Sequence, residues 1–362
     1  MLPEETLSRA GKLKEWLKQR RVGAFLITNL VNIKYLTGFS GSNGYLLVSG
    51  AAGEDNYFFT DFRYKEQSAT EVGSCDIIIT KKDPIRFIIN FIEKKKIKKI
   101  AFEDTINYRT FELFKKKFQV KALRDAIENI RMNKDTVELR HINRAALRAE
   151  DALNDIKPHI KKGVTEKAIS SMLAERLTAK GVEKIPFEII AASGKRSSMP
   201  HARATDKALE KGDLLIIDWG GESGGYYSDM TRTFLIGGGN DSGKKKEIYD
   251  IVLKANVRAR DSIKKGQSAS DVDRVARAVI EDAGYGRYFG HSTGHGIGME
   301  VHERPYISAM NRKQKISENM VFTIEPGIYI PDIGGVRIED MVVVTSQSAE
   351  TVTNLSRELE IL

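Results

Sequence analysis

Two acidic residues stand in apolar, strand-like runs, and this feature constrains the fold more than any other. Asp218 ends the apolar run 214–217, and Glu325 lies in the strand-like run 319–330. Fully buried carboxylates are rare in proteins unless a cation or a metal ion compensates their charge. The fold must therefore bring compensating groups to both acids.

The segment after the first acid predicts a partner for it. Residues 222–225, ESGG, are typical of a hairpin turn. Folding the chain between residues 223 and 224 places Asp218 opposite Asp229 on one face. Like charges that face each other directly are destabilising. A bound cation would remove that penalty and make the two acids a ligand pair.

The second acid has an equivalent partner. Residues 329–335 look like a turn centred on Asp332, from which Glu325 and Glu339 are equally distant. The neighbours of both acids are apolar, so this pair is also expected to point inward. Four inward acids need four units of positive charge, which Arg337 cannot supply alone. Two divalent cations can.

Histidines gather in two short segments. The glycine-rich segment 290–303 contains His291, His295 and His302, and His201 lies in another loop, so four of the six histidines fall in these two places. Glycines let the backbone approach a site closely. One imidazole with four carboxylates favours Mn²⁺, Co²⁺, Fe²⁺ or Zn²⁺ over a thiolate-type structural zinc site.

Each of these residues has an ordinary structural role when it is considered alone. An aspartate can cap a turn, a glutamate can end a solvated strand, and a histidine can be a satisfied core residue. Together they favour a site with paired metal ions, which can activate water and polarise a carbonyl group.

The first part of the chain alternates between helical and strand-like segments, which is typical of an α/β layer domain. Helices are expected at residues 4–21, 63–71, 84–96 and 108–118. Strands are expected at residues 23–29, 45–50, 56–62, 75–80 and 98–104. This part contains no glycine-rich phosphate loop and no Cys/His cluster, so its sequence indicates no chemistry.

The character of the sequence then changes. Residues from about 125 to 180 are mainly helical, and strand-like runs follow after Gly181, with two helices near 243–265 and 269–283 between them. This pattern predicts an α+β domain with a mainly antiparallel sheet. We place the boundary between residues 127 and 128, which gives an N-terminal domain 1–127 and a catalytic domain 128–362.

One internal similarity suggests a pseudo-twofold catalytic domain. The segments KGDLLIIDWG and ENMVFTIEPG align with Gly212 over Asn319 and with Asp218 over Glu325. Each is a polar start, an apolar run and then a carboxylate closely followed by glycine. Chance similarity between two buried strands is the competing explanation.

Composition excludes several classes of protein. The formal net charge is +9, and residues 1–125 hold 23 Lys and Arg against 15 Asp and Glu. These lysines flank apolar elements, so a solvated face is favoured over a nucleic-acid interface. No apolar run of membrane-spanning length and no signal pattern is found. A single cysteine, Cys75, precludes an intrachain disulfide framework and fits a cytoplasmic protein.

Six segments in order resemble the signature segments of the Xaa-Pro peptidases. These are MPHA, IIDWGG, GYYSDMTRTF, GHSTGHGIGMEVHE, TIEPGIYI and GGVRIED. The family includes aminopeptidase P and prolidase and shares its "pita-bread" catalytic fold with methionine aminopeptidase. The segments NIKYLTGFSGSNGYLLV and YFFTDFRYKEQ resemble the creatinase-type N-terminal domain. The resemblance thus covers nearly the whole chain. Trp219 in place of Phe and Met230 in place of Ile are conservative departures that put nothing catalytic in doubt. Asn319 stands where a glycine is expected before the Glu325 strand, a change that could alter that turn.

The resemblance implies roles for individual residues. Asp218 is expected to bind one metal ion, His295 and Glu325 the other, and Asp229 and Glu339 to bridge the two. Glu325 is also expected to move a proton. His201, His291 and His302 would line the substrate site. Arg337 would orient ligands or meet a substrate carboxylate.

The main functional expectation is an Xaa-Pro aminopeptidase that uses two divalent ions, with manganese favoured. A strict Xaa-Pro dipeptidase is the closest alternative. Methionine aminopeptidase generally lacks the long N-terminal domain, creatinase lacks this ligand set, and non-catalytic binding relatives lack the ligands. The resemblance further implies short proline-containing peptides as substrates and a homodimer.

Overall fold

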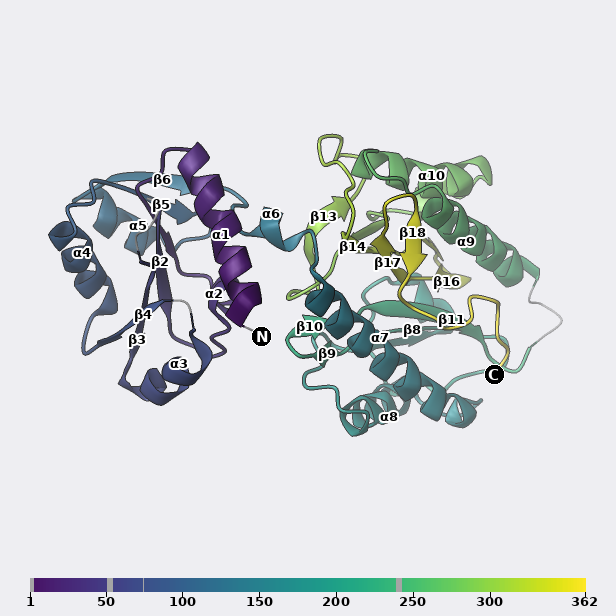
Figure 1. Ribbon diagram of the computed structural model, residues 1–362. Helices are drawn as coiled ribbons and strands as arrows, with labels where there is room; N and C mark the ends of the chain where they lie inside the picture. The colour runs from purple at the N-terminus through teal and green to yellow at the C-terminus, as the bar shows by residue number, and fades with distance from the viewer. Residues whose placement is uncertain (1–2, 51–54, 74, 239–242) are drawn as a thin grey trace. The chain divides into compact units, whose positions relative to one another are not determined.

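The chain forms two compact units, and each is described by itself. The computed structural model describes residues 3–50, 55–73, 75–238 and 243–362. The units are Met1–Arg131 and Met132–Leu362, and both are drawn in Figure 1. The division falls a few residues after the boundary that we place between residues 127 and 128.

The first unit is a six-stranded mixed sheet with helices on both faces. The strand order is β4-β3-β2-β1-β5-β6, with antiparallel pairing from β1 to β3 and parallel pairing elsewhere. Its strands are β1 (Ala24–Ile27), β2 (Tyr45–Ser49), β3 (Tyr57–Asp61), β4 (Asp76–Thr80), β5 (Lys99–Glu103) and β6 (Gln119–Leu123). Its helices are α1 (Pro3–Gln19), α2 (Leu30–Thr37), η1 (Phe62–Tyr64), α3 (Lys65–Glu71), α4 (Pro84–Lys94), α5 (Tyr108–Lys115) and α6 (Glu128–Arg131).

Alternation along the strands divides the core of this unit into two layers. Leu26 and Phe102 face α4 and α5, where they pack against Ile88, Ile92 and Phe114. Helix α1 lies on the opposite face (Figure 1). All the helices and strands that the sequence predicts here are present, and the structure adds α2 and β6.

The second unit contains the antiparallel strands and four long helices. The helices are α7 (Thr136–Ile156), η2 (Lys157–His159), α8 (Glu166–Ala179), η3 (Gly194–Ser198), α9 (Gly243–Asp261), α10 (Ala269–Asp282) and η4 (Gly286–Tyr288). The strands up to α9 are β7 (Ile190–Ser193), β8 (Leu214–Trp219), β9 (Glu222–Ser223), β10 (Tyr226–Tyr227) and β11 (Met230–Leu235). The later strands are β12 (Gly294–Gly296), β13 (Glu303–Ile307), β14 (Val321–Ile324), β15 (Gly327–Ile330), β16 (Gly334–Arg337), β17 (Asp340–Val344) and β18 (Ala349–Thr351).

These strands form two main sheets with the helix pairs α7–α8 and α9–α10 packed beside them (Figure 1). One sheet has the order β11-β8-β7 and the other β13-β12-β14-β17-β18. All pairs in both sheets are antiparallel, as the sequence predicts. Among the described residues, no helix has the length and apolar character needed to cross a bilayer.

The predicted register of the first hairpin is wrong by two residues. Asp218 pairs with Thr231, not with Asp229. The turn is formed by Gly224 and Gly225, whose φ angles of 60° and 84° are both positive, as the tight hairpin turn of type I′ requires. Because side chains alternate with a period of two, a shift of two residues keeps Asp218 and Asp229 on the same face.

The predicted register of the second hairpin is confirmed. On one side of the acid pair Gly327 faces Arg337, and on the other side Ile324 faces Asp340. Both pairs belong to the register centred on Asp332. Glu325 therefore lies opposite Glu339.

The two acid-bearing strands also begin alike, which supports the internal repeat. The backbone N–H of Gly212 donates to Ile236 and that of Asn319 donates to Val344, at 2.7 and 2.8 Å. Both Gly212 and Asn319 have a positive φ, of 87° and 64°. The same backbone geometry thus delivers Asp218 from β8 and Glu325 from the end of β14.

Candidate active site

The four acids follow one row of residues across the joined strands. Asp218 pairs with Thr231, Thr231 forms a bridge to Glu339, and Glu339 lies opposite Glu325. Residues that face each other across neighbouring strands point to the same side of a sheet. Asp229 precedes Thr231 by two residues and shares that side. The backbone alone thus directs all four carboxylates toward one place.

A cavity of about 550 Å³ lies over this row. All nine residues that the sequence predicts for the site line it. They are His201, Asp218, Asp229, His291, His295, His302, Glu325, Arg337 and Glu339. The structure therefore brings together every residue of the predicted set, although their individual roles stay predictions.

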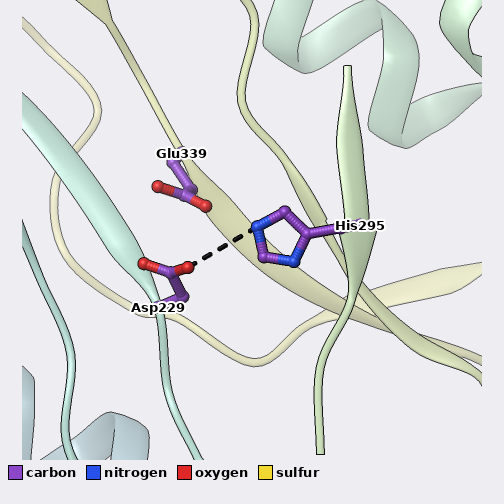
Figure 2. A group of neighbouring side chains, drawn as sticks. All are labelled: Asp229, His295 and Glu339. Carbon is purple, nitrogen blue, oxygen red and sulfur yellow. Dashed lines mark ion pairs between the residues drawn. The ribbon is translucent and has the colours of Figure 1, made fainter. Parts of the chain in front are cut away.

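Asp229, His295 and Glu339 form the tightest group. One possible ligand atom from each lies within 4.8 Å of the others, and their side chains point toward one another (Figure 2). The Nε2 atom of His295 is 3.6 Å from a carboxylate oxygen of Asp229 and equally far from one of Glu325. These separations are too long for hydrogen bonds but suit groups that share a cation.

Two carboxylate oxygens in the cluster lack the partners that burial demands. Oδ1 of Asp218 and Oε1 of Glu339 are buried and accept no hydrogen bond from any described residue. A buried polar atom without a partner costs free energy. Oxygen and imidazole ligands with vacant lone pairs suit hard or borderline divalent ions. The donor set therefore fits a metal centre.

The electrostatics of the protein alone also indicate missing positive charge. Burial, followed by the charges of Glu339, Asp218 and Glu325, raises the pKa of Asp229 well above its ordinary value. Burial likewise raises the pKa of Glu339, and Glu325 and Asp218 add to the shift. Burial raises the pKa of Glu325 to about 7 against the opposing charge of Arg337. Without cations these acids are thus driven toward their neutral forms.

His295 is held in the form that a ligand needs. Its Nδ1 lies 3.2 Å from the carbonyl oxygen of Gly296, so Nδ1–H donates there and Nε2 keeps a free lone pair toward the acids. Burial, helped by His302, lowers the pKa of His295 to about 4, which keeps the ring neutral. Gly294 permits this placement, since a Cβ atom there would lie 1.8 Å from the carbonyl oxygen of Thr323.

Arg337 joins the acid cluster to His291 through a tyrosine. Its Nη2 donates to Asp218 at 2.6 Å and its Nη1 to the hydroxyl of Tyr329 at 2.9 Å. The Tyr329 hydroxyl in turn lies 3.0 Å from Nε2 of His291. Since Nδ1 of His291 lies 2.7 Å from the Ser292 carbonyl and donates to it, Nε2 accepts the tyrosine proton. This series of hydrogen bonds favours the ligand-orienting role of Arg337.

Two buried acids fix the loops that carry His201 and His291. Glu166 of α8 accepts from the backbone N–H groups of Ser193 and Thr205, one on each side of His201. Asp273 of α10 accepts from the backbone N–H of Thr293, and its partner Arg277 donates to the His291 carbonyl. Each half of the domain thus uses one helix acid to hold one histidine loop.

Several residues of the site are not predicted from the sequence. Thr231 donates to Glu339 at 2.7 Å and accepts from Nε of Arg337 at 3.1 Å. Tyr329 lies four residues after Glu325, which is two periods of the alternation along a strand. This spacing is the signal that could have placed it on the same face. The cavity is also lined by residues that belong to none of the sequence motifs. They are Phe187, Glu188, Ile190, Arg203 and Tyr306.

Comparison with known proteins gives this arrangement its family. Residues 140–346 match Metallopeptidase family M24, and residues 9–133 match the Creatinase/Prolidase N-terminal domain. The chain belongs to metallopeptidase family M24. The predicted fold is thereby confirmed, namely an α+β pita-bread catalytic domain preceded by an α/β creatinase-like domain. The predicted metallopeptidase activity follows from the same membership.

Relatives of this M24 chain match it over almost their full length. A protein named Xaa-Pro dipeptidase from Pyrococcus furiosus is 38% identical over 97% of this chain and 99% of its own length. A solved Xaa-Pro dipeptidase from Bacillus anthracis superposes with a TM-score of 0.93, at 36% identity, over 99% of this chain and 100% of that chain. An X-Pro aminopeptidase from Thermotoga maritima superposes with a TM-score of 0.88, at 36% identity, over 98% and 99% of the two chains.

Proposed function

We propose that this M24 chain hydrolyses dipeptides of the form Xaa-Pro. The observation that carries the proposal is the row of four carboxylates, two buried and two partly buried, with His295 on the wall of one cavity. The named dipeptidase relatives supply the substrate class. A dipeptide of this form is small enough for a cavity of about 550 Å³.

The family resemblance favours an aminopeptidase, which removes the first residue from longer Xaa-Pro peptides. The names of the relatives support the dipeptidase alternative better. The aminopeptidase stays as a second candidate because the Thermotoga maritima structure of that name matches this chain with the same 36% identity.

We propose that two divalent ions would be held by five residues, namely Asp218, Asp229, His295, Glu325 and Glu339. Asp229 and Glu339 would serve both ions. When bound, such a pair lowers the pKa of water and polarises a carbonyl group. Four negative charges on the acids are balanced by two divalent cations, which accounts for burial of the cluster. Manganese as the native metal, a homodimer and a cytoplasmic location remain predictions from the sequence.

The residues of the chain would then bind and orient the substrate. The Arg337 guanidinium fixes Asp218, and Glu325 would carry a proton between the attacking water and the leaving proline nitrogen. His201, His291 and His302 line the cavity. A ring N–H of His201 or His302 could donate to the peptide carbonyl as negative charge develops on it, whereas both ring nitrogens of His291 already bond to Ser292 and Tyr329. The Xaa-Pro bond has no N–H of its own, so recognition cannot depend on one.

The proposal is tested with purified protein reconstituted with Mn²⁺. We expect turnover of Ala-Pro, little turnover of Ala-Pro-Gly-Gly, and loss of activity after chelation. Comparable rates on the two peptides would instead identify the aminopeptidase. No turnover of either peptide, at any metal loading, would refute both candidates.

Asp229→Asn tests the ligand assignment. We expect at least a hundredfold loss of kcat, an order-of-magnitude estimate for a lost bridging acid, with less bound metal and a retained fold by circular dichroism. Asp250→Asn is the matched control, since Asp250 is exposed on α9 and outside the cavity. Near-normal activity of Asp229→Asn would show that the assignment is wrong.

A further inference from the structure

Arg203 and Glu188 form an ion pair on the wall of the cavity. Nε of Arg203 lies 3.1 Å from Oε2 of Glu188, and their side chains are 84% and 59% exposed. An ion pair this exposed contributes little to folding stability. Another carboxylate can therefore replace Glu188 beside the guanidinium at low cost.

Arg337, the other arginine on the cavity wall, already donates hydrogen bonds to four groups of the protein. Nε of Arg337 donates to Thr231 and Nη2 to Asp218. Its Nη1 donates to the Tyr329 hydroxyl and to the Pro200 carbonyl. These bonds use four of its five N–H groups, so a substrate carboxylate could not bind Arg337 through two parallel hydrogen bonds without displacing one of these partners. Arg203 and Arg337 are the two arginines among the described lining residues, so Arg203 is the one open to a ligand.

The backbone beneath Arg203 is held firmly. Arg196 donates from Nη2 to the Arg203 carbonyl at 2.6 Å and from Nε to Glu166 at 3.1 Å. The Thr205 backbone N–H donates to the same Glu166 carboxylate at 3.0 Å. Glu166 is buried. The Arg203 side chain therefore extends from a fixed main chain, which limits the volume in which its guanidinium can be found.

We propose that Arg203 binds the free carboxylate of the dipeptide and so selects dipeptides over longer peptides, an inference that rests on the proposed function. A dipeptide carries its carboxylate on the residue directly after the cleaved bond. A longer peptide carries it farther away, and an amidated one has none. The planar guanidinium suits a carboxylate because it can donate two parallel hydrogen bonds.

The test compares Ala-Pro with Ala-Pro-amide, which differ only in the terminal charge. For Arg203→Gln we expect the KM for Ala-Pro to rise by roughly tenfold, as for a lost charge-assisted hydrogen bond. Its kcat, and both constants for Ala-Pro-amide, should stay close to those of the unchanged protein. Arg258→Gln, an exposed change on α9 outside this cavity, should alter neither substrate.

Glu188→Gln provides a second and opposite measurement. Removal of the competing carboxylate should lower the KM for Ala-Pro by about threefold and leave that for Ala-Pro-amide unchanged. An equal effect of Arg203→Gln on both substrates, or an unchanged KM for Ala-Pro, would overturn the inference. Failure of the unchanged, metal-loaded protein on every Xaa-Pro substrate would instead refute the proposed function, and the inference with it.

Discussion

Asn319 begins the strand that leads to Glu325 with a backbone conformation that few side chains tolerate. Its φ is 64°, in the left-handed region, and its counterpart Gly212 has a φ of 87°. Asparagine enters this region more easily than most residues because its short polar side chain hydrogen-bonds locally. Asn319 thus adopts the left-handed conformation that Gly212 adopts at the equivalent position.

A pair of substitutions tests this account of Asn319. Asn319→Ala should lower the free energy of unfolding by about 1 kcal/mol, since a Cβ without a compensating polar group is strained there. Asn319→Gly should be close to neutral. Urea denaturation of the metal-loaded protein measures both. Equal destabilisation by the two changes would show that the asparagine side chain, rather than the backbone conformation, is what matters.

Helix α10 holds the His291 loop through an ion pair between buried Asp273 and partly buried Arg277. Asp273 is fully buried and accepts from both Nε and Nη2 of Arg277 at 2.9 Å. It also accepts from the hydroxyl and the backbone N–H of Thr293. Because the Thr293 carbonyl accepts from the backbone N–H of Glu325, the same acid supports a predicted metal ligand.

Asp273→Asn should therefore destabilise the protein and disturb the site together. We expect a loss of about 3 kcal/mol in the free energy of unfolding, because the partly buried Arg277 loses its counter-ion and the Thr293 N–H loses a charged acceptor. Arg274→Gln is the control on the same helix, because its ion pair with Asp271 is exposed on both sides and should contribute under about 1 kcal/mol. Urea denaturation compares the two, and similar small losses would contradict the assigned role of Asp273.

The first hairpin and helix α2 show which features of the fold could be predicted from the sequence. Alternation placed Asp218 and Asp229 on one face even though the hairpin register was wrong by two residues, because parity is insensitive to such a shift. The turn itself could not be located within ESGG, since either the Ser-Gly or the Gly-Gly pair can form one. Helix α2 was missed although Asn29 caps its start and Gly38 its end.

Strand β6 was missed for a different reason. It is an edge strand that pairs only with β5, and most of its residues are exposed. An edge strand needs little apolar alternation, so its sequence, QVKAL, carries a weak pattern. The buried strands and the acids on them were predictable because burial leaves a strong pattern. Tyr329 and Thr231 could be assigned to the site only from the true register of the strands.

The catalytic unit as a whole brings together four negatively charged side chains that its own cationic groups do not balance. Four acids converge on one cavity, and Arg337 is the arginine bonded to them directly. A folded state with these acids ionised is costly, and a folded state with divalent cations is not. Metal binding and folding should therefore be thermodynamically linked.

This linkage predicts that Glu325 makes opposite contributions to the pH dependence of the metal-free and the metal-loaded protein. Burial raises the pKa of Glu325 from 4.5 to about 7. A group whose pKa is higher in the folded state contributes stability that is present below its unfolded pKa and lost as the pH rises through the folded value. The contribution of Glu325 to the free energy of unfolding of the metal-free protein should thus fall between pH 4.5 and 7.

Metal ions bind the ionised acids, so the loaded protein should instead gain stability over the same range. Thermal unfolding with chelator and with Mn²⁺, at several pH values, measures both slopes. Glu325→Gln separates this acid from the rest of the chain, since its metal-free form should lose stability less steeply. A metal-free slope that this substitution leaves unchanged would mean that Glu325 is already ionised in the folded protein, and that a positive charge of the chain itself balances it.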